Sequence, residues 1–274
     1  MNLLFDFSEY KKMGVTFIKI PNDLFFIGNE GGSFVKLMDY NLLIVLTYLN
    51  TQKNIIDNIN FSIGELINFC GLKPKTGVGN TNYKIREIVK YLINNEIIYL
   101  INNVDIDTID IDILIKAKVT KEDNNFTKIS LDVIEKILNS GYRFRNKILT
   151  YWCYLHSRVY KKKDAGDNKA QVTWVSLDKI SLDTGLSKET IMSYNDTLVK
   201  LGLLKYINLG TKKKGKLKEK CSNIYITIDG SISNEFVDIY LKEGVNQYKH
   251  YLKENGWTLI EKKGDIKNEQ RNGI

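Results

Sequence analysis

The fold is decided by the stretch Ser-Leu-Asp-Lys-Ile-Ser-Leu-Asp-Thr-Gly-Leu-Ser-Lys-Glu-Thr-Ile at residues 176–191. Ser176 stands directly before an apolar turn, in the position of a helix N-cap. Gly185 is placed to end that helix in the left-handed conformation, and Ser187 is placed to cap the next helix. A short helix, a glycine turn and a second helix are typical of a helix-turn-helix.

The residues that follow predict a wing. The second helix carries apolar residues at helical spacing: Ile191, Tyr194, Leu198 and Leu201. Two β-strands are then expected at 204–209 and 223–228, joined by a lysine-rich hairpin. Residues 175–228 therefore outline a winged helix-turn-helix.

An internal repeat places a similar outline earlier in the chain. Each copy begins with an extended piece, continues with an apolar helix, and then carries a Ser-capped helix that ends at Gly-Leu. The matched pairs are 17–24 with 126–133, 42–49 with 148–155, 61–67 with 175–180, and 71–72 with 185–186. Additional residues in each copy fall at loops, within 73–79 in the first copy and around 160–167 in the second.

The repeat predicts an α+β fold with two tandem winged helix-turn-helix domains and a C-terminal helix. The chain has 274 residues, which fits two domains if a domain takes about 150 residues. We place the first domain at 1–125 and the second at 126–232, and the C-terminal helix with a tail at 233–274. We expect residues 262–274 to be disordered, because they are polar.

The positive charge lies in the second copy. The chain has 40 Lys+Arg and 32 Asp+Glu, a net charge of +8. Residues 1–125 hold 13 and 15 of these, a net of −2, so residues 126–274 hold 27 and 17, a net of +10. Such asymmetry indicates a nucleic-acid or anionic-membrane partner for the second part.

Six lysines of the second hairpin form the strongest functional signal. A lysine binds phosphate as a mobile point charge and releases condensed counterions, so these residues predict DNA-backbone binding with little sequence discrimination. The alternative is a hairpin whose charges are merely solvated. The six are Lys212, Lys213, Lys214, Lys216, Lys218 and Lys220, and Lys161, Lys162 and Lys163 would extend the same patch.

The second helix of each helix-turn-helix is expected to face the DNA bases. In the second copy the candidate base-reading residues are Lys188, Thr190 and Ser193, although the carboxylates of Glu189 and Asp196 would be repelled by phosphate. Asn195 lies where many such domains carry an apolar residue.

In the first copy the candidate readers are Asn82, Lys84 and Arg86, because Asn pairs with adenine and Arg with guanine. The alternative is an ordinary polar helix face. Lys73 and Lys75 of the preceding loop are candidate phosphate contacts.

The first wing is acidic. Residues 104–113 alternate aspartate with apolar residues, which predicts a strand pair with one buried and one acidic face. We expect this face to point away from DNA or to bind a basic surface. A metal site is not favoured, because the spacing lacks the Gly and the final Glu of a calcium loop.

A further helix is expected at 234–255. Its apolar stripe comprises Phe236, Ile239, Tyr240, Tyr248, Tyr251 and Leu252. This stripe packs on the second copy or, alternatively, forms a homodimer contact.

The sequence offers no sign of catalysis. His156 and His250 are far from each other and from Cys70, Cys153 and Cys221, and we found no nucleotide-binding or nucleophile motif. We therefore expect a protein that is not an enzyme and has no cofactor or metal. Without a long apolar run or signal-peptide pattern we expect no membrane partner and a cytoplasmic location.

Together these features resemble the tandem winged-helix replication initiators of plasmids and phages of Gram-positive bacteria. The resemblance is carried by the architecture and by the pieces Phe-Ile-Lys-Ile-Pro-Asn-Asp-Leu-Phe (17–25) and Gly-Leu-Ser-Lys-Glu-Thr-Ile (185–191). It implies binding to repeated sequences of a double-stranded DNA origin and recruitment of host replication proteins. The alternatives are a transcriptional regulator or accessory factor of a mobile element, and a protein-interaction module that uses the acidic face.

Overall fold

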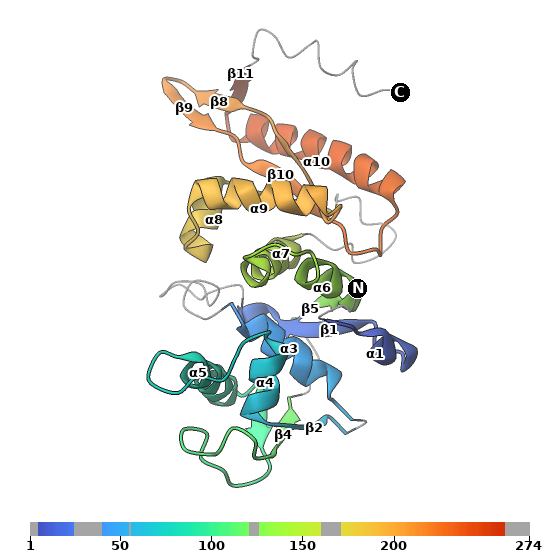
Figure 1. Cartoon of the computed structure of the whole chain (residues 1–274). Coiled ribbons are helices and arrows are strands. Elements are labelled where there is room, and N and C mark those ends of the chain that lie inside the picture. Colours follow the sequence, from blue (N-terminus) through green and yellow to red (C-terminus); the bar gives the residue numbers. More distant parts are fainter. Residues whose placement is uncertain (1–4, 25–39, 55, 121–125, 160–170, 261–274) are drawn as a thin grey trace. The chain divides into compact units, whose positions relative to one another are not determined.

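The computed structural model describes residues 5–24, 40–54, 56–120, 126–159 and 171–260. The chain divides into two compact units, Met1–Ser157 and Arg158–Ile274. Both combine helices with small antiparallel sheets, so the fold is α+β (Figure 1). The predicted tail and the lysines at 161–163 lie outside the described residues.

The first unit contains helices, a 3-10 turn and two small sheets. Its helices and 3-10 turn are α1 (Ser8–Lys12), η1 (Asn22–Leu24), α3 (Leu42–Thr51), α4 (Ile63–Phe69), α5 (Thr81–Asn94), α6 (Leu131–Leu138) and α7 (Arg145–Arg158), of which the last ends one residue inside the second unit. Its strands are β1 (Phe17–Pro21), β2 (Asn58–Phe61), β3 (Ile98–Leu100), β4 (Ile115–Val119) and β5 (Phe126–Ser130), paired as β1-β5 and β2-β4-β3.

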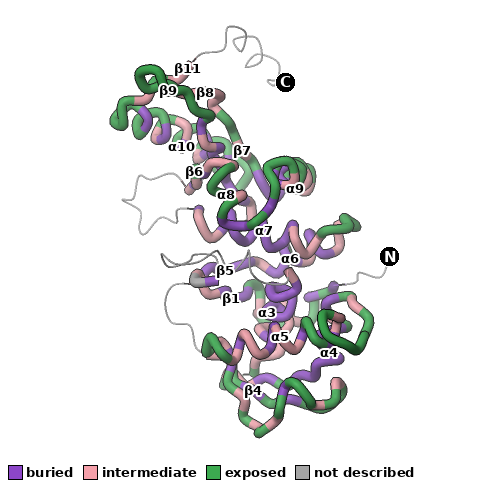
Figure 2. Tube along the Cα trace, turned by 90° about the vertical axis from the view of Figure 1, so that its left-hand side faces the viewer, coloured by how far each residue is buried: buried purple, intermediate pink, exposed green. Residues whose placement is uncertain are grey.

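Two helices of this unit are buried almost all round. From Leu42 to Leu46 every residue of α3 is buried, and so is every residue of α7 from Ile148 to His156 (Figure 2). The apolar stripes predicted at 42–49 and 148–155 are therefore confirmed as core. Burial on all sides explains why apolar residues on these helices exceed a single stripe.

The opening strands of the two repeats pair with each other. Phe17 lies opposite Ser130 and Pro21 lies opposite Phe126, in an antiparallel ladder. The compact units consequently divide between residues 157 and 158 rather than at the repeat boundary of 125 and 126. The repeat reports the order of the elements, but a short strand pairs wherever an edge can satisfy its backbone groups.

The second unit contains α8 (Leu177–Thr184), α9 (Lys188–Lys200) and α10 (Asn234–Glu254). Its strands are β6 (Thr173–Val175), β7 (Leu204–Asn208), β8 (Thr211–Lys214), β9 (Leu217–Lys220), β10 (Asn223–Thr227) and β11 (Thr258–Ile260). They form two antiparallel sheets, β6-β10-β7 and β11-β8-β9. The second sheet was not expected, because the sequence predicted a hairpin of two strands alone.

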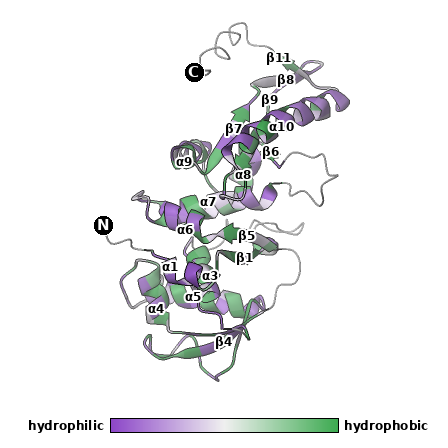
Figure 3. Cartoon of the chain, turned by 90° about the vertical axis from the view of Figure 1, so that its right-hand side faces the viewer, coloured by the Kyte–Doolittle hydropathy of each residue, from purple (hydrophilic) through white to green (hydrophobic). Residues whose placement is uncertain are grey.

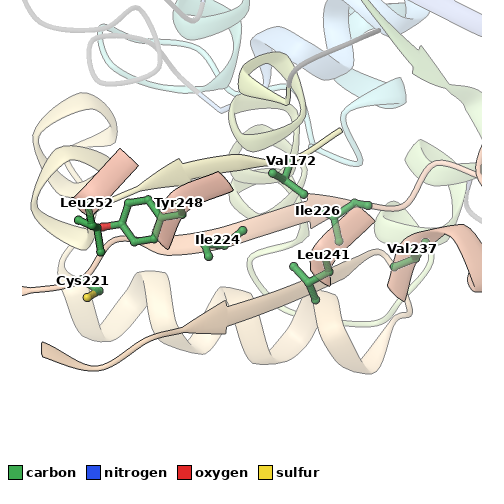
Figure 4. Close-up of a cluster of buried hydrophobic side chains, with 8 residues drawn as sticks. All are labelled: Val172, Cys221, Ile224, Ile226, Val237, Leu241, Tyr248 and Leu252. Carbon is green, nitrogen blue, oxygen red and sulfur yellow. The ribbon is translucent and has the colours of Figure 1, made fainter. Parts of the chain in front are cut away.

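The predicted C-terminal helix is confirmed as α10, which packs on the sheet of its own unit. Its buried residues are Val237, Leu241, Gly244, Tyr248 and Leu252, and all of these except Gly244 belong to one buried cluster with Ile224 and Ile226 of β10 (Figure 4). The predicted stripe is therefore partly wrong, because Phe236, Ile239 and Tyr251 are exposed. Hydrophilic positions prevail on the side of α10 that Figure 3 shows.

The predicted strand pair at 104–113 is also wrong. This segment belongs to the loop of residues 101–114 between β3 and β4, and Asp side chains shape its turns. Asp105 accepts hydrogen bonds from the Asp107 backbone N–H at 2.9 Å and from the Thr108 hydroxyl at 2.8 Å. Asp110 accepts one from the Asp112 N–H at 3.0 Å. Asp side chains that bond to the backbone two residues on favour turns, and here they override the alternating pattern.

Candidate nucleic-acid interface

The α8–α9 turn is built from the three residues that the sequence singled out. The Ser176 hydroxyl accepts the Lys179 N–H at 3.1 Å, and the Ser187 hydroxyl accepts the Thr190 N–H at 3.2 Å. Gly185 ends α8 with φ +69°, and its N–H donates to the Ser181 carbonyl at 2.9 Å. A residue with a Cβ is strained at this φ, so glycine determines where α9 begins.

The face of α9 that points to solvent is mixed in charge. Ile191, Tyr194, Asn195 and Leu198 are buried, whereas Lys188, Glu189, Met192, Ser193 and Asp196 are exposed. Lys188 is paired with Asp178, and the Thr190 hydroxyl lies 3.0 Å from that of Ser187. Lys188 and Thr190 thus both have partners for their polar side-chain groups. Ser193 is the third candidate reader, and its hydroxyl makes no hydrogen bond to a described residue.

Glu189 keeps a negative charge on this face. Its pKa is lowered because its carboxylate accepts hydrogen bonds from its own backbone N–H and from Ser187. An ionised carboxylate repels phosphate but accepts a hydrogen bond from a cytosine amino group. The negative charge of Glu189 therefore makes the exposed face of α9 unfavourable for contact with phosphate.

The lysine-rich hairpin consists of β8, β9 and a two-residue turn. Gly215 has φ +58° at the first turn position, the glycine position of a type II′ hairpin turn. In the ladder Lys213 lies opposite Lys218, and Lys212 lies opposite Glu219. Since side chains alternate along a strand, the hairpin separates its lysines between two faces.

One face of the hairpin carries Lys213, Lys218 and Lys220, and we call these three residues the lysine face. All three are exposed. Within the ranges that the structure describes, none of them makes an ion pair. Lys213 and Lys218 lie opposite each other, and opposed like charges destabilise a β-ladder. A bound anion would relieve this repulsion.

The other face of the hairpin holds Lys212 in place. The Lys212 Nζ lies 3.2 Å from the Glu219 carboxylate and 4.2 Å from the centre of the Trp257 ring. Its side chain is only 16% exposed. Of the six lysines predicted to bind phosphate, Lys212 therefore has a structural role in the hairpin.

The two remaining lysines lie towards the tip. Lys214 shares the face of Lys212, and a Cβ placed on Gly256 would lie 3.4 Å from its Cε. Lys216 occupies the second turn position, where it is exposed. Both leave their ammonium groups near the hairpin end without fixing them in an ion pair with a described residue.

The segment after α10 braces the hairpin. Strand β11 pairs with β8, with Leu259 opposite Lys212. Trp257 and Leu259 pack against the cluster of buried residues in Figure 4, which ties β11 to α10 and β10. The hairpin thus projects from the unit (Figure 1) as part of a three-stranded sheet rather than as a free loop.

In the first unit two candidate readers turn inward. Asn82 is buried, and its side-chain oxygen accepts the Lys75 N–H at 2.8 Å. Arg86 donates to the carbonyls of Ile106 and Ile109 in the 101–114 loop. These internal bonds hold the loops on either side of α5, so neither side chain is presented to a base. Lys84, Lys73 and Lys75 are exposed.

Among the described residues, no group of three or more His, Cys, Asp or Glu side chains is placed to hold a metal ion. His156 is buried and stacks on Trp152 at 4.6 Å between ring centres, and His250 lies 3.3 Å from Glu254. Cys70, Cys153 and Cys221 are buried free thiols, and burial raises the pKa of Cys153.

Comparison with known proteins assigns no family, since no family model and no curated protein matches this sequence. The described helices also include none that is both long and apolar enough to cross a lipid bilayer. The assignment of a function therefore depends on the geometry of the second unit.

Proposed function

We propose that the second unit is a winged helix that binds double-stranded DNA, with the lysine face on the phosphate backbone and α9 towards the bases. The observation that carries this proposal is the lysine face itself. Lys213, Lys218 and Lys220 are exposed side by side on a braced hairpin, with no ion pair to a described residue. Exposed ammonium groups on one face of a braced hairpin suit the closely spaced phosphates of a duplex.

Sequence preference is assigned to α9 in this proposal. Ser193 offers a hydroxyl, and Glu189 accepts hydrogen bonds from a cytosine amino group. The carboxylates of Glu189 and Asp196 reduce affinity for phosphate, so α9 discriminates among sequences while the hairpin supplies affinity. Lys214 and Lys216 add phosphate contacts at the hairpin tip.

The experiment measures DNA affinity of the full chain at graded salt by fluorescence anisotropy. The variant carries Lys213→Gln, Lys218→Gln and Lys220→Gln. The matched control carries Lys242→Gln, Lys249→Gln and Lys253→Gln, which remove the same charge from exposed positions of α10. The plot of log K against log salt has a negative slope, and each lost phosphate contact reduces the magnitude of that slope by about 0.9.

We expect the hairpin variant to reduce the magnitude of this slope by about 2 to 3, and we expect the α10 control to change it much less. Equal slopes in the two variants would assign the effect to net charge and would refute a phosphate-binding hairpin. Wild-type protein without salt-dependent DNA affinity would refute the function as a whole.

We further propose that the bound DNA is a replication origin of a plasmid or phage. The support is the resemblance of the tandem architecture and of the pieces at 17–25 and 185–191 to replication initiators. A role as transcriptional regulator would use the same surface. A plasmid that depends on this gene should fail to replicate with the hairpin variant, and unchanged replication would favour the regulator.

DNA binding in a bacterial host implies a cytoplasmic location. A homodimer through α10 would use Phe236, Ile239 and Tyr251, which α10 leaves exposed after packing on its own sheet. Host replication proteins would be recruited by surfaces other than the lysine face.

A further inference from the structure

A buried polar network connects α9 with the base of the hairpin. Asn195 of α9 is fully buried, and its amide donates to the Tyr225 hydroxyl of β10 at 3.4 Å. The Asn223 amide donates to the same hydroxyl at 2.7 Å. The amides of Asn195, from the helix, and Asn223, from the strand, thus both donate to the hydroxyl oxygen of Tyr225 inside the unit.

The network continues to Gly210, the residue directly before β8. Asn208, at the end of β7, lies opposite Asn223 in the ladder and donates to its side-chain oxygen. The Asn208 amide also donates to the Cys221 carbonyl at 3.2 Å, and its own oxygen accepts the Gly210 N–H at 2.8 Å. The Cys221 N–H in turn donates to the Gly210 carbonyl at 2.9 Å.

Polar residues in these positions are costly unless their geometry is kept. A buried amide without its partners costs free energy, whereas apolar residues of similar size would pack without any directional requirement. Asn195, Tyr225 and Asn223 therefore penalise every arrangement of α9 and the sheet except the one in which their hydrogen bonds form. A fully bonded buried network in this way specifies one geometry.

We infer that Asn195, Tyr225, Asn223 and Asn208 are positioning residues that fix the lysine face relative to α9. The inference rests on the proposed DNA binding and names the residues that determine its geometry. Two surfaces that must contact one duplex at the same time gain affinity when they are preorganised, because less freedom is lost on binding. The network supplies this preorganisation without contacting DNA.

The test uses Tyr225→Phe, which removes the shared hydroxyl and keeps the ring. The matched control is Tyr206→Phe, because the Tyr206 ring stacks on that of Tyr225 at 5.6 Å and lies outside the network. Hydrogen exchange of the Gly210 amide, measured by NMR without DNA, reports the far end of the network. DNA affinity of the same full-length variants reports its use.

We expect Gly210 to exchange about three- to tenfold faster in Tyr225→Phe, the change produced by losing one hydrogen bond. Specific DNA affinity should fall by a similar factor, and Tyr206→Phe should change neither quantity. Equal exchange in the two variants would overturn the network as a unit. Faster exchange with unchanged DNA affinity would overturn its positioning role.

A second variant guards against loss of folding. Asn208 is exposed on an outer strand, so Asn208→Ala cuts the last link without opening the core. It should lower DNA affinity while the melting temperature stays close to that of wild type, and unchanged affinity would contradict the inference. If wild-type protein binds no DNA at all, the proposed function fails, while the exchange measurement still decides whether the network exists.

Discussion

The Lys212 ammonium group lies 4.2 Å from the centre of the Trp257 ring and 3.2 Å from the Glu219 carboxylate. Its neighbour Lys213 points to the opposite face of the same strand and is exposed. Two adjacent lysines in one charged run thus have different tasks. The first stabilises the hairpin and the second is available to a partner.

This division predicts opposite phenotypes. Lys212→Gln should lower the free energy of unfolding by about 1 kcal/mol, since it loses a cation–π contact and an ion pair in which the lysine is mostly buried and the glutamate is exposed. Lys213→Gln should leave stability unchanged or raise it slightly, because it removes the repulsion from Lys218 across the ladder, and it should lower the salt dependence of DNA binding. Urea denaturation and anisotropy on the same samples check both results. Identical stability losses in the two variants would contradict the assignment.

Gly244 is predicted to be essential for the packing of α10. A Cβ at this position would lie 2.6 Å from the Val172 Cγ2. Gly244→Ala should therefore destabilise the protein by about 1–3 kcal/mol by overpacking. At an exposed position of a helix the same change would be stabilising, because alanine has a higher helix propensity than glycine.

The clash can be separated from other effects by a double variant. Val172→Ala removes the methyl groups that a Gly244→Ala side chain would meet. In urea denaturation the loss of unfolding free energy in the double variant should be smaller than the sum of the two single-variant losses, by about 0.5 kcal/mol or more. Strict additivity would show that Val172 is not the residue that excludes the side chain.

Arg86 is predicted to stabilise the 101–114 loop. Arg86→Met removes the donor that binds the carbonyls of Ile106 and Ile109, and the loss should be about 1.5–3 kcal/mol. Lys84→Met, at an exposed position of the same helix, is the control and should be nearly neutral. Urea denaturation measures both. DNA affinity should be unaffected, and a selective loss of affinity with Arg86→Met would restore this residue as a base reader.

The turn at Asp105 is predicted to loosen in acid. The pKa of Asp105 is lowered because its carboxylate accepts hydrogen bonds from the Asp107 N–H and the Thr108 hydroxyl. A depressed pKa in the folded state stabilises the turn at pH values above the ordinary carboxyl range, and that stability is lost as the pH falls through the lowered value.

Hydrogen exchange of the Asp107 amide, referred to the intrinsic rate at each pH, should show constant protection from pH 7 to about pH 5 and a decrease below about pH 4. The Asp105→Asn variant lacks this titration, so its protection should not follow the same curve. A decrease centred near neutral pH would point to another group.

The sequence predicted the local elements well where a single residue determines the geometry. Ser62, Ser176 and Ser187 cap helices, and Gly71 and Gly185 adopt positive φ as expected. Apolar spacing also identified the buried residues of α3, α7 and α9. These features depend on neighbours within a few positions, which is the information that a sequence pattern contains.

The errors have a common physical cause. The alternation at 104–113 predicts a strand pair, but hydrogen bonds of the Asp105 and Asp110 side chains form turns instead. The residue types at 82 and 86 predict base readers, but Asn82 and Arg86 bond to loops seven to twenty-three residues away. The partner of a polar side chain depends on the tertiary structure, and the spacing of polar residues along a helix does not reveal it.

The candidate interface was therefore predicted in outline. The charge count located the hairpin, but strand alternation and the pairing with β11 were needed to distinguish Lys213, Lys218 and Lys220 from Lys212. Trp257 indicates that a packing contact forms near the end of the predicted C-terminal helix, because a tryptophan ring buries a large apolar surface. Which residue would cover it could not be predicted from the sequence.

The pairing of β1 with β5 constrains how the chain can be dissected. A cut between residues 125 and 126 would look natural from the repeat, yet it would separate Phe17–Pro21 from Phe126–Ser130. Each fragment would then carry a strand whose five residues have lost their ladder partner, and such edges recruit other chains. Truncations that follow the sequence repeat should yield aggregates, so boundaries for separate expression have to respect the strand pair.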